Sequence, residues 1–229
     1  MLVKAAILAL AQQCAPNVAP HTMQTLVMAE SSGNPYAIGV VGAQLTPQPA
    51  TKDEAIATAK GLISQGAKIA GGLGQIYVDN WEKLGLTVET VFDQCQNITA
   101  AGQILSTCYG RGVKAMGDGQ AALQAAFSCY YSNNFSRGLV KEGPNRPSYV
   151  MKIAMDSERI RVPGITFKPS DVNEVAPGQK PELPQEPAEP AKPEKALEEF
   201  QQLQAEKKDP EGAQPTGDPT SWDVLGDFN

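Results

Sequence analysis

Apolar residues in the first 165 positions recur mainly at intervals of three and four, the spacing that places side chains on one face of an α-helix. Strand-like patterns are few and short, and they lie around residues 77–78 and 86–88. Besides a helix that ends near Ser31, the spacing predicts helices over 51–66, 97–109, 120–131 and 148–158. We therefore expect a mainly α domain with a short β element.

The helix over 51–66 carries its own start and stop signals. The hydroxyl of Thr51 can cap a free backbone N–H group, and Glu54 three residues later completes the capping-box pattern. Gly66 suits the end of the helix because glycine adopts the left-handed conformation there without strain. The predicted apolar face consists of Ile56, Ala59, Leu62 and Ile63.

Two further helices are expected at the centre of the domain. The segment 120–131 is rich in alanine, whose small side chain lets a helix pack closely against its neighbours. In the segment 97–109, the residues in register on one face are Ile98, Ala101, Leu105 and Cys108.

The first residues allow two interpretations. Lys4 followed by the apolar run 5–11 resembles a secretory signal peptide, but the run is short and no separate polar gap precedes the next helix. The alternative, which we favour, is a first core helix with Ile7, Leu8 and Leu10 facing inward. No other segment approaches the roughly 20 apolar residues of a membrane-spanning helix, so no integral membrane span is expected.

The composition changes after residue 165. Eleven of the 18 prolines lie at or beyond Pro163, and the run PELPQEPAEPAKPEK lacks residues that could build a core. We therefore assign 1–165 to the folded domain and 166–229 to a disordered, Pro-rich acidic tail. Near its end the tail contains the aromatic and apolar segment SWDVLGDF. Further upstream, Leu197, Phe200 and Leu203 are three residues apart, as on one face of a helix. These residues are either incidental to disorder or form two docking motifs for a partner.

Charge follows the same division. The formal net charge is −6, but residues 168–229 alone hold 14 acidic and 6 basic residues, a net of −8. The first 167 residues hold 11 acidic and 13 basic residues, a net of +2. No stretch combines basic and aromatic residues as nucleic-acid binding requires, so nucleic acid is not expected as a partner.

The chain has four cysteines, and none lies in a Cys-x-x-Cys pair. The single histidine, His21, is expected at the surface, so no metal site is predicted. An even number of cysteines suits two disulfides outside the cytosol, whereas a cytosolic protein would keep four buried thiols. Cys108 and Cys129 lie on consecutive predicted helices, which makes their pairing the easier one and leaves Cys14 with Cys95.

Glu30 is the residue that the helical pattern does not explain. Met23, Leu26 and Val27 mark an apolar stripe, and Glu30 continues that stripe at the end of the helix. A buried, unpaired carboxylate is costly and keeps its proton to a higher pH than an exposed one. The alternative is a glutamate at a helix end that turns to solvent.

Several motifs together resemble one enzyme family. Glu30-Ser31-Ser32-Gly33-Asn34-Pro35-Tyr36-Ala37 resembles the catalytic signature of the lysozyme-like soluble lytic transglycosylases. The family's Gly-Leu-Met-Gln-Ile loop is matched, except at Gly74, by Gly72-Leu73-Gly74-Gln75-Ile76. Its Asn-Ile helix and closing helix are matched by Asn97-Ile98 and Tyr149-Val150. Tyr130 stands at the tyrosine of its Ala-Tyr-Asn-Ala-Gly motif, where this chain continues with Tyr131-Ser132-Asn133.

The resemblance implies a fold, a place and a substrate. The fold would be the lysozyme-like α+β fold. The run Ala15-Pro16-Asn17-Val18-Ala19-Pro20 and the helical insert at 51–66 resemble the branch that accompanies type IV secretion and conjugation systems. This implies a periplasmic enzyme that acts on peptidoglycan glycan strands, needs no cofactor, and meets type IV secretion components through its tail.

The resemblance also implies the roles of single residues. Glu30 would be the only catalytic acid and base, protonating the leaving oxygen of the MurNAc-GlcNAc β-1,4 bond. The muramic acid's own 6-hydroxyl would then attack C1 and form 1,6-anhydro-MurNAc. Tyr130 would hydrogen-bond Glu30 and orient it. The implied supporting or substrate-binding residues also include Ser31, Gln75 and Asn97.

Two other functions stay open. A hydrolytic muramidase needs a second carboxylate, about 5 Å or about 6.5–9.5 Å from the first. The acidic residues Asp79, Glu82 and Asp93 look like surface residues of the segment 77–95, and the lack of an evident partner agrees with a transglycosylase. A glycan-binding scaffold that recruits secretion components through its tail is the other alternative, because this chain departs from the family at Gly74 and Asn133.

Overall fold

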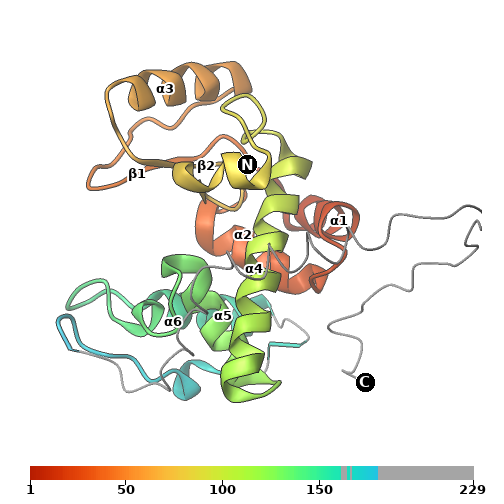
Figure 1. Cartoon of the computed structure of the whole chain (residues 1–229), viewed down its shortest axis with the longest axis vertical. Helices are drawn as coiled ribbons and strands as arrows, with labels where there is room; N and C mark the ends of the chain where they lie inside the picture. The colour runs from red at the N-terminus through yellow and green to blue at the C-terminus, as the bar shows by residue number, and fades with distance from the viewer. Residues whose placement is uncertain (161–163, 166, 180–229) are drawn as a thin grey trace, which may run out of the picture.

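Helices form most of the described chain, which comprises residues 1–160, 164–165 and 167–179 of a computed structural model (Figure 1). The helices are α1 (Lys4–Cys14), α2 (Pro20–Ser31), α3 (Lys52–Ser64), α4 (Gln94–Met116), α5 (Gln120–Ser132) and α6 (Tyr149–Ile160). Short 3-10 turns are η1 (Val78–Asn80), η2 (Glu82–Leu84), η3 (Arg137–Leu139) and η4 (Pro169–Asp171). A small antiparallel sheet has the order β1-β2-β3. The expected mainly α, lysozyme-like α+β fold is confirmed.

The long helix α4 runs through the centre of the protein (Figure 1). Asp93 caps its first turn, since its carboxylate accepts the Gln96 backbone N–H at 3.0 Å. The sheet and α3 lie toward one end of α4, whereas α5 and α6 lie toward the other (Figure 1). The predicted apolar face of α4 is confirmed, because all four of its residues are buried: Ile98, Ala101, Leu105 and Cys108.

Small residues bring α4 and α5 close together. A Cβ added to Gly112 of α4 would lie 2.8 Å from the backbone oxygen of Ala122 in α5, so only glycine allows this approach. The alanines Ala122, Ala125 and Ala126 are all buried. The close packing expected from the alanine-rich sequence is therefore what the structure contains.

Helix α2 carries Glu30 to the centre of the molecule. Pro20 stands in its first turn, where the missing N–H costs no hydrogen bond. The stripe residues Met23, Leu26 and Val27 are fully buried. Ser32 ends the helix in the left-handed conformation with φ of 53°. Glu30 is therefore fixed in the last turn of a helix whose apolar face is anchored in the core.

The sheet is small and differs from the strands that the sequence predicts. It consists of β1 (Ile38–Val40), β2 (Ile69–Gly71) and β3 (Ile76–Tyr77), with Gly39 opposite Ala70 and Gly71 opposite Ile76. The prediction at 77–78 is confirmed for Tyr77 but not for Val78, which begins η1. The prediction at 86–88 is wrong, since the Leu86 N–H bonds the Trp81 carbonyl in a turn. Strands of two or three residues are too short to show an alternating pattern.

The start of α3 agrees with its prediction, although Ile63 of the predicted apolar face is 37% exposed. Thr51 accepts the Glu54 backbone N–H at 3.2 Å, while the Glu54 carboxylate accepts the Ala50 N–H at 2.9 Å. In α1, Ile7 is fully buried and Leu10 packs against the core, so the segment is a core helix of this domain. Leu8, which we also expected to face inward, is only partly buried.

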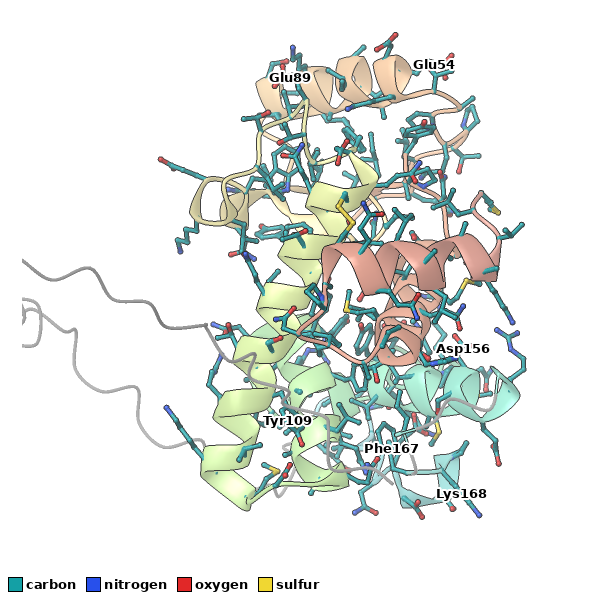
Figure 2. The ribbon with its side chains drawn as sticks, turned by 90° about the vertical axis from the view of Figure 1, so that its right-hand side faces the viewer. Glu54, Glu89, Tyr109, Asp156, Phe167 and Lys168 are labelled. Carbon is teal, nitrogen blue, oxygen red and sulfur yellow. A yellow bond between two sulfur atoms is a disulfide. The ribbon has the colours of Figure 1, made fainter. Side chains whose placement is uncertain are left out.

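The folded part continues past the expected boundary at residue 165. The ring of Phe167, labelled in Figure 2, packs edge-on against Phe127. The ring centroids are 6.4 Å apart, and Val172 is buried. Val175 also forms a parallel bridge with Val140. Proline-rich composition hid these contacts, because they depend on packing against distant helices. The possible docking motifs at 197–203 and 221–228 lie outside the described residues.

Two disulfides join the helices, with the pairing that the sequence analysis favours. Cys14 pairs with Cys95, which joins the end of α1 to the start of α4. Cys108 pairs with Cys129, which joins α4 to α5. Disulfides persist in oxidising compartments. Within the described ranges, no helix is long and apolar enough to cross a membrane.

Removing the Cys14–Cys95 bond should destabilise the protein more than removing the Cys108–Cys129 bond. The first closes a loop with a sequence separation of 81 residues and the second one of 21. Because a longer closed loop restricts the unfolded chain more, the first paired Cys→Ala variant should lose about 1 kcal/mol more unfolding free energy than the second. Urea unfolding followed by circular dichroism measures both losses, and the reverse order would contradict the prediction.

Candidate active site

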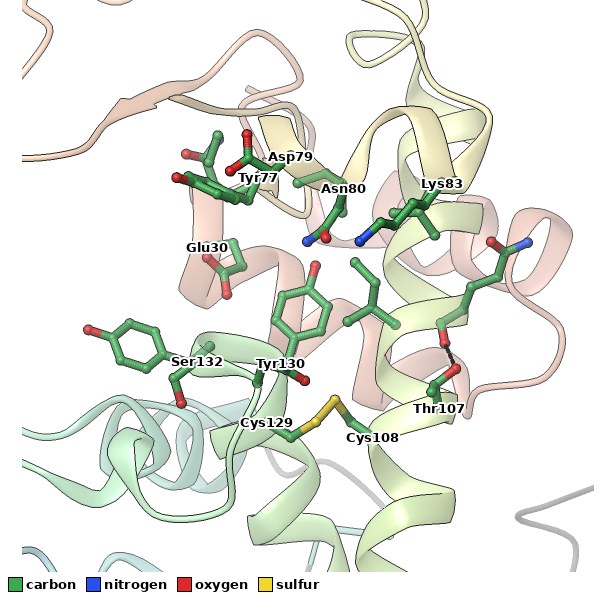
Figure 3. Close-up of a pocket in the computed structure, with 18 of the residues that line it drawn as sticks. Glu30, Tyr77, Asp79, Asn80, Lys83, Thr107, Cys108, Cys129, Tyr130 and Ser132 are labelled. Carbon is green, nitrogen blue, oxygen red and sulfur yellow. Dashed lines mark hydrogen bonds between the residues drawn. A yellow bond between two sulfur atoms is a disulfide. The ribbon is translucent and has the colours of Figure 1, made fainter. Parts of the chain in front are cut away.

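A cleft of about 1250 Å³ opens beside the end of α2 (Figure 3). Gln75 and Tyr77 line the wall that the sheet forms, and Tyr130 at the end of α5 lines the opposite wall. Thr107 of α4 lies at one end, and Glu30 lies between the two walls (Figure 3). The motifs at Glu30, Gln75 and Tyr130, which are far apart in the sequence, therefore meet at one cleft.

The carboxyl group of Glu30 is held in protein surroundings rather than turned out into bulk water. The residue as a whole is partly exposed, at the side that lines the cleft. Burial of the carboxyl group raises the pKa of Glu30 from 4.5 to about 7, while the Tyr149 hydrogen bond and the charge of Lys152 oppose that rise. Near neutral pH a substantial fraction of Glu30 is therefore protonated, which is the state a general acid needs.

Tyr149, at the start of α6, is the direct partner of Glu30. Its hydroxyl donates a hydrogen bond to Glu30 Oε1 at 2.5 Å, and the residue is only 4% exposed. Burial and the nearby Glu30 hold the pKa of Tyr149 well above its usual range, so the phenol stays a donor. The sequence places Tyr149 in the closing helix but assigns it no role. Its position beside Val150 on the buried face was the available signal.

Tyr130 does not make the hydrogen bond that we predicted for it. Its hydroxyl donates to the Gly74 carbonyl at 2.7 Å instead. Burial, with a smaller contribution from the charge of Glu30, holds the pKa of Tyr130 well above its usual range, so the ring does lie near the acid. Tyr130 therefore fastens the end of α5 to the loop across the cleft. The hydrogen bond to Glu30 that we predicted for Tyr130 is made by Tyr149 instead.

Asn97 holds that loop from behind. Its side-chain oxygen accepts the Gly74 N–H at 2.7 Å, and its amide donates to the carbonyls of Gly71 and Val91 at 2.9 and 2.8 Å. Asn97 is 1% exposed, so it has no surface toward the cleft. A Cβ on Gly72, whose φ is +81°, would lie 2.2 Å from the Asn97 amide nitrogen. Asn97 thus supports the loop and does not face a substrate.

Ser31 and Gln75 connect the same loop to α2 and β1. The Ser31 hydroxyl lies 2.8 Å from the Leu73 carbonyl, which joins the residue after Glu30 to the loop. The Gln75 amide donates to the carbonyls of Ala37 and Gly72 at 3.0 and 2.9 Å, and its side chain lines the cleft. Of the two, Gln75 is the one placed to contact a ligand.

The other acidic residues considered in the sequence analysis, and His21, do not share the buried surroundings of Glu30. Asp79 is exposed at the rim of the cleft, and its carboxylate lies 2.6 Å from Lys68 Nζ. Glu82 is exposed, and Asp93 caps α4. His21 is half-buried in the first turn of α2. Across the described residues, no group of three or more His, Cys, Asp or Glu side chains is arranged to hold a metal ion.

Comparison with known proteins decides the family. The sequence profile named Transglycosylase SLT domain matches residues 7–130, more than half of the chain. The chain belongs to the transglycosylase SLT family. The matched range holds Glu30, the glycine-rich loop, Asn97 and Tyr130, whereas Tyr149 lies beyond it.

Curated relatives of this SLT protein carry the name virB1. It is 47% identical over 163 residues to the "Type IV secretion system protein virB1" of Brucella abortus biovar 1, which covers 71% of this chain and 66% of that protein. The protein of the same name from Brucella suis biovar 1 gives the same values. "Protein virB1" of Agrobacterium fabrum is 29% identical over 166 residues, 72% of this chain and 64% of that protein. The aligned region thus spans just under two thirds of these relatives. No solved structure matches.

Gly74, where this chain differs from the loop motif that it resembles, has no room for a side chain. A Cβ at this position would lie 2.8 Å from the Ala101 Cβ and 2.9 Å from the Tyr130 hydroxyl. The space that a side chain would need is occupied by α4 and by the tyrosine that binds the Gly74 carbonyl. The departure is therefore accommodated within the site and leaves the cleft intact.

Replacing Tyr149 with Phe should raise the pKa of Glu30 above about 7. The Tyr149 hydrogen bond favours the ionised carboxylate and lowers that pKa, so its removal acts upward. An NMR titration of the Glu30 side-chain carboxyl carbon measures the change.

Tyr130→Phe is the matched control for this prediction. It also removes one phenol hydroxyl, but that hydroxyl binds Gly74 and not Glu30, so the titration should move much less. A larger shift in Tyr130→Phe than in Tyr149→Phe would show that the two tyrosines had been assigned the wrong partners.

Proposed function

We propose that this protein is a peptidoglycan lytic transglycosylase that cleaves the β-1,4 bond between MurNAc and GlcNAc. The observation that carries the proposal is Glu30, an acid with a pKa of about 7 at the wall of a cleft. Membership of the SLT family supports the same reaction. A glycosidic bond breaks only when its leaving oxygen receives a proton, and a carboxyl group that stays protonated near neutral pH can deliver it.

Glu30 would act twice in one cycle. First, its proton passes to the glycosidic oxygen while the bond from that oxygen to C1 of MurNAc breaks. The resulting carboxylate then takes the proton of the MurNAc 6-hydroxyl, whose oxygen bonds to C1. The products are a shortened glycan and a 1,6-anhydro-MurNAc end, no water is consumed, and Glu30 regains its proton.

Tyr149 would serve the middle of this cycle. Its hydrogen bond to Glu30 Oε1 stabilises the carboxylate that exists between the two proton transfers. The same bond fixes one carboxyl oxygen, which leaves the other for the substrate. Gln75 lines the cleft and would contact the sugars, while Ser31, Asn97 and Tyr130 would hold the loop that carries it.

The hydrolytic alternative requires a second carboxylate near the cleaved bond. Asp79 is the other acidic residue that lines the cleft, but it is exposed and paired with Lys68. A carboxylate engaged in this way is poorly placed to activate water. The arrangement therefore favours the reaction in which the sugar supplies its own nucleophile.

We also propose a periplasmic setting and a role in opening the cell wall for a type IV secretion or conjugation channel. The virB1 name of the Brucella relatives refers to a type IV secretion system, and the two disulfides suit an oxidising compartment. Secretion-system components would bind through residues beyond 179, and recruitment by this tail could accompany catalysis.

Digestion of purified sacculi followed by mass spectrometry of the muropeptides tests the reaction. The wild-type protein should release 1,6-anhydro products, whereas Glu30→Gln should lower the rate by about 100- to 10,000-fold because an amide cannot donate the required proton. Products that carry an added water and a reducing end would indicate a muramidase instead. Full activity of a normally folded Glu30→Gln variant would refute the catalytic assignment.

A chain that ends at residue 179 should digest sacculi at a rate within about twofold of the full chain. This truncation keeps Phe167, Val172 and Val175, which pack on the domain, so the fold is preserved. A chain that ends at residue 165 is the contrasting variant, and it should be less stable to urea. A large loss of activity on ending at 179 would mean that the tail takes part in glycan cleavage.

A further inference from the structure

Tyr131 stacks against the tyrosine that binds the catalytic glutamate. Its ring lies 4.9 Å from the Tyr149 ring, centroid to centroid, and the two planes differ by 17°. Tyr131 is 41% exposed and lines the cleft, whereas Tyr149 is 4% exposed. The Tyr131 ring therefore covers a face of Tyr149 on the side of the cleft, where water and substrate enter.

The backbone that carries Tyr131 is fastened on both sides. Before it, Cys129 forms a disulfide with Cys108 of α4, and the Tyr130 hydroxyl donates a hydrogen bond to the Gly74 carbonyl. After it, Asn133 accepts two hydrogen bonds from the guanidinium of Arg111, at 2.6 Å to its side-chain oxygen and 3.2 Å to its carbonyl. A ring on so constrained a turn can act as a fixed support for its neighbour.

We propose that Tyr131 is a positioning residue that acts through Tyr149, holding that ring so that its hydroxyl reaches Glu30 and keeping water from their hydrogen bond. This support involves the hydroxyl of Tyr149 but not that of Tyr131, because stacking uses only the ring.

The physical basis is the loss of freedom of the Tyr149 side chain. Stacked aromatic pairs are held by an interaction large enough to change the population of a ring position several-fold. Without the Tyr131 ring, one face of Tyr149 would be open to the cleft, and water would compete for its hydroxyl and for the Glu30 carboxyl group. The Tyr149–Glu30 bond would then form for a smaller fraction of the time.

A double-mutant cycle tests the proposal in the kinetics, and this part rests on the proposed function. Tyr131→Ala should lower kcat for sacculus digestion about fivefold with KM within about twofold, and Tyr131→Phe should restore kcat because it keeps the ring. In a Tyr149→Phe background, Tyr131→Ala should cost little more. Equal losses in both backgrounds would overturn the proposal, as would a change confined to KM, which would indicate direct contact between Tyr131 and the sugar.

A second measurement does not depend on catalysis. The Tyr149 hydroxyl proton, buried in a 2.5 Å hydrogen bond, should give a slowly exchanging proton NMR signal that is absent in Tyr149→Phe. In Tyr131→Ala this proton should exchange with water at least tenfold faster, and in Tyr131→Phe at nearly the wild-type rate. An unchanged exchange rate in Tyr131→Ala, or no protected signal in the wild-type protein, would overturn the proposal.

The two measurements also separate the two hypotheses. If the wild-type protein released no anhydro products, the proposed function would fail, while the exchange rates would still decide whether Tyr131 shields the Tyr149–Glu30 bond. If sacculi were digested as expected but Tyr131→Ala changed neither kcat nor exchange, the positioning role alone would be refuted.

Discussion

The site depends on keeping one carboxyl group in protein surroundings. Glu30 continues the buried stripe of α2, so the helix that anchors the core also carries the acid. Burial favours the protonated form and brings its pKa to about 7, yet the Tyr149 hydrogen bond still stabilises the carboxylate when it forms. These opposing effects give a group that can lose and regain a proton near neutral pH, which the proposed mechanism requires of Glu30.

Such a balance requires walls that do not move. Asn97 uses its carbonyl and its amide to hold the loop that follows β2, and Gly72 and Gly74 let α4 approach that loop closely. Disulfides join α4 to α1 and to α5, and the second of them lines the cleft. Because each of these contacts links segments far apart in the chain, the geometry around Glu30 is a property of the whole domain.

The departures from the SLT motifs fit one another. Gly74 makes room for the Tyr130 hydroxyl, which then binds the loop backbone instead of Glu30. Tyr149 provides the donor that Glu30 needs, and Tyr131 lies against Tyr149. Thus Tyr130 fastens the loop, Tyr149 binds Glu30, and the Tyr131 ring stacks on Tyr149.

The sequence by itself determined what depends on neighbours along the chain. Helical spacing located the helices, Thr51 and Glu54 marked the start of α3, and the break in the apolar stripe singled out Glu30. Helix formation and capping are local, so the local pattern is sufficient.

Only the tertiary structure decided which side chains meet. Tyr149 lies 119 residues from Glu30 in the sequence and reaches it because α6 packs beside α2. The contact between Phe167 and Phe127 and the pairing of β1 with β2 likewise join segments that are distant in the sequence. Hydrogen bonding and packing between distant segments depend on the direction of each side chain in three dimensions. The spacing of residues along the chain does not contain that direction.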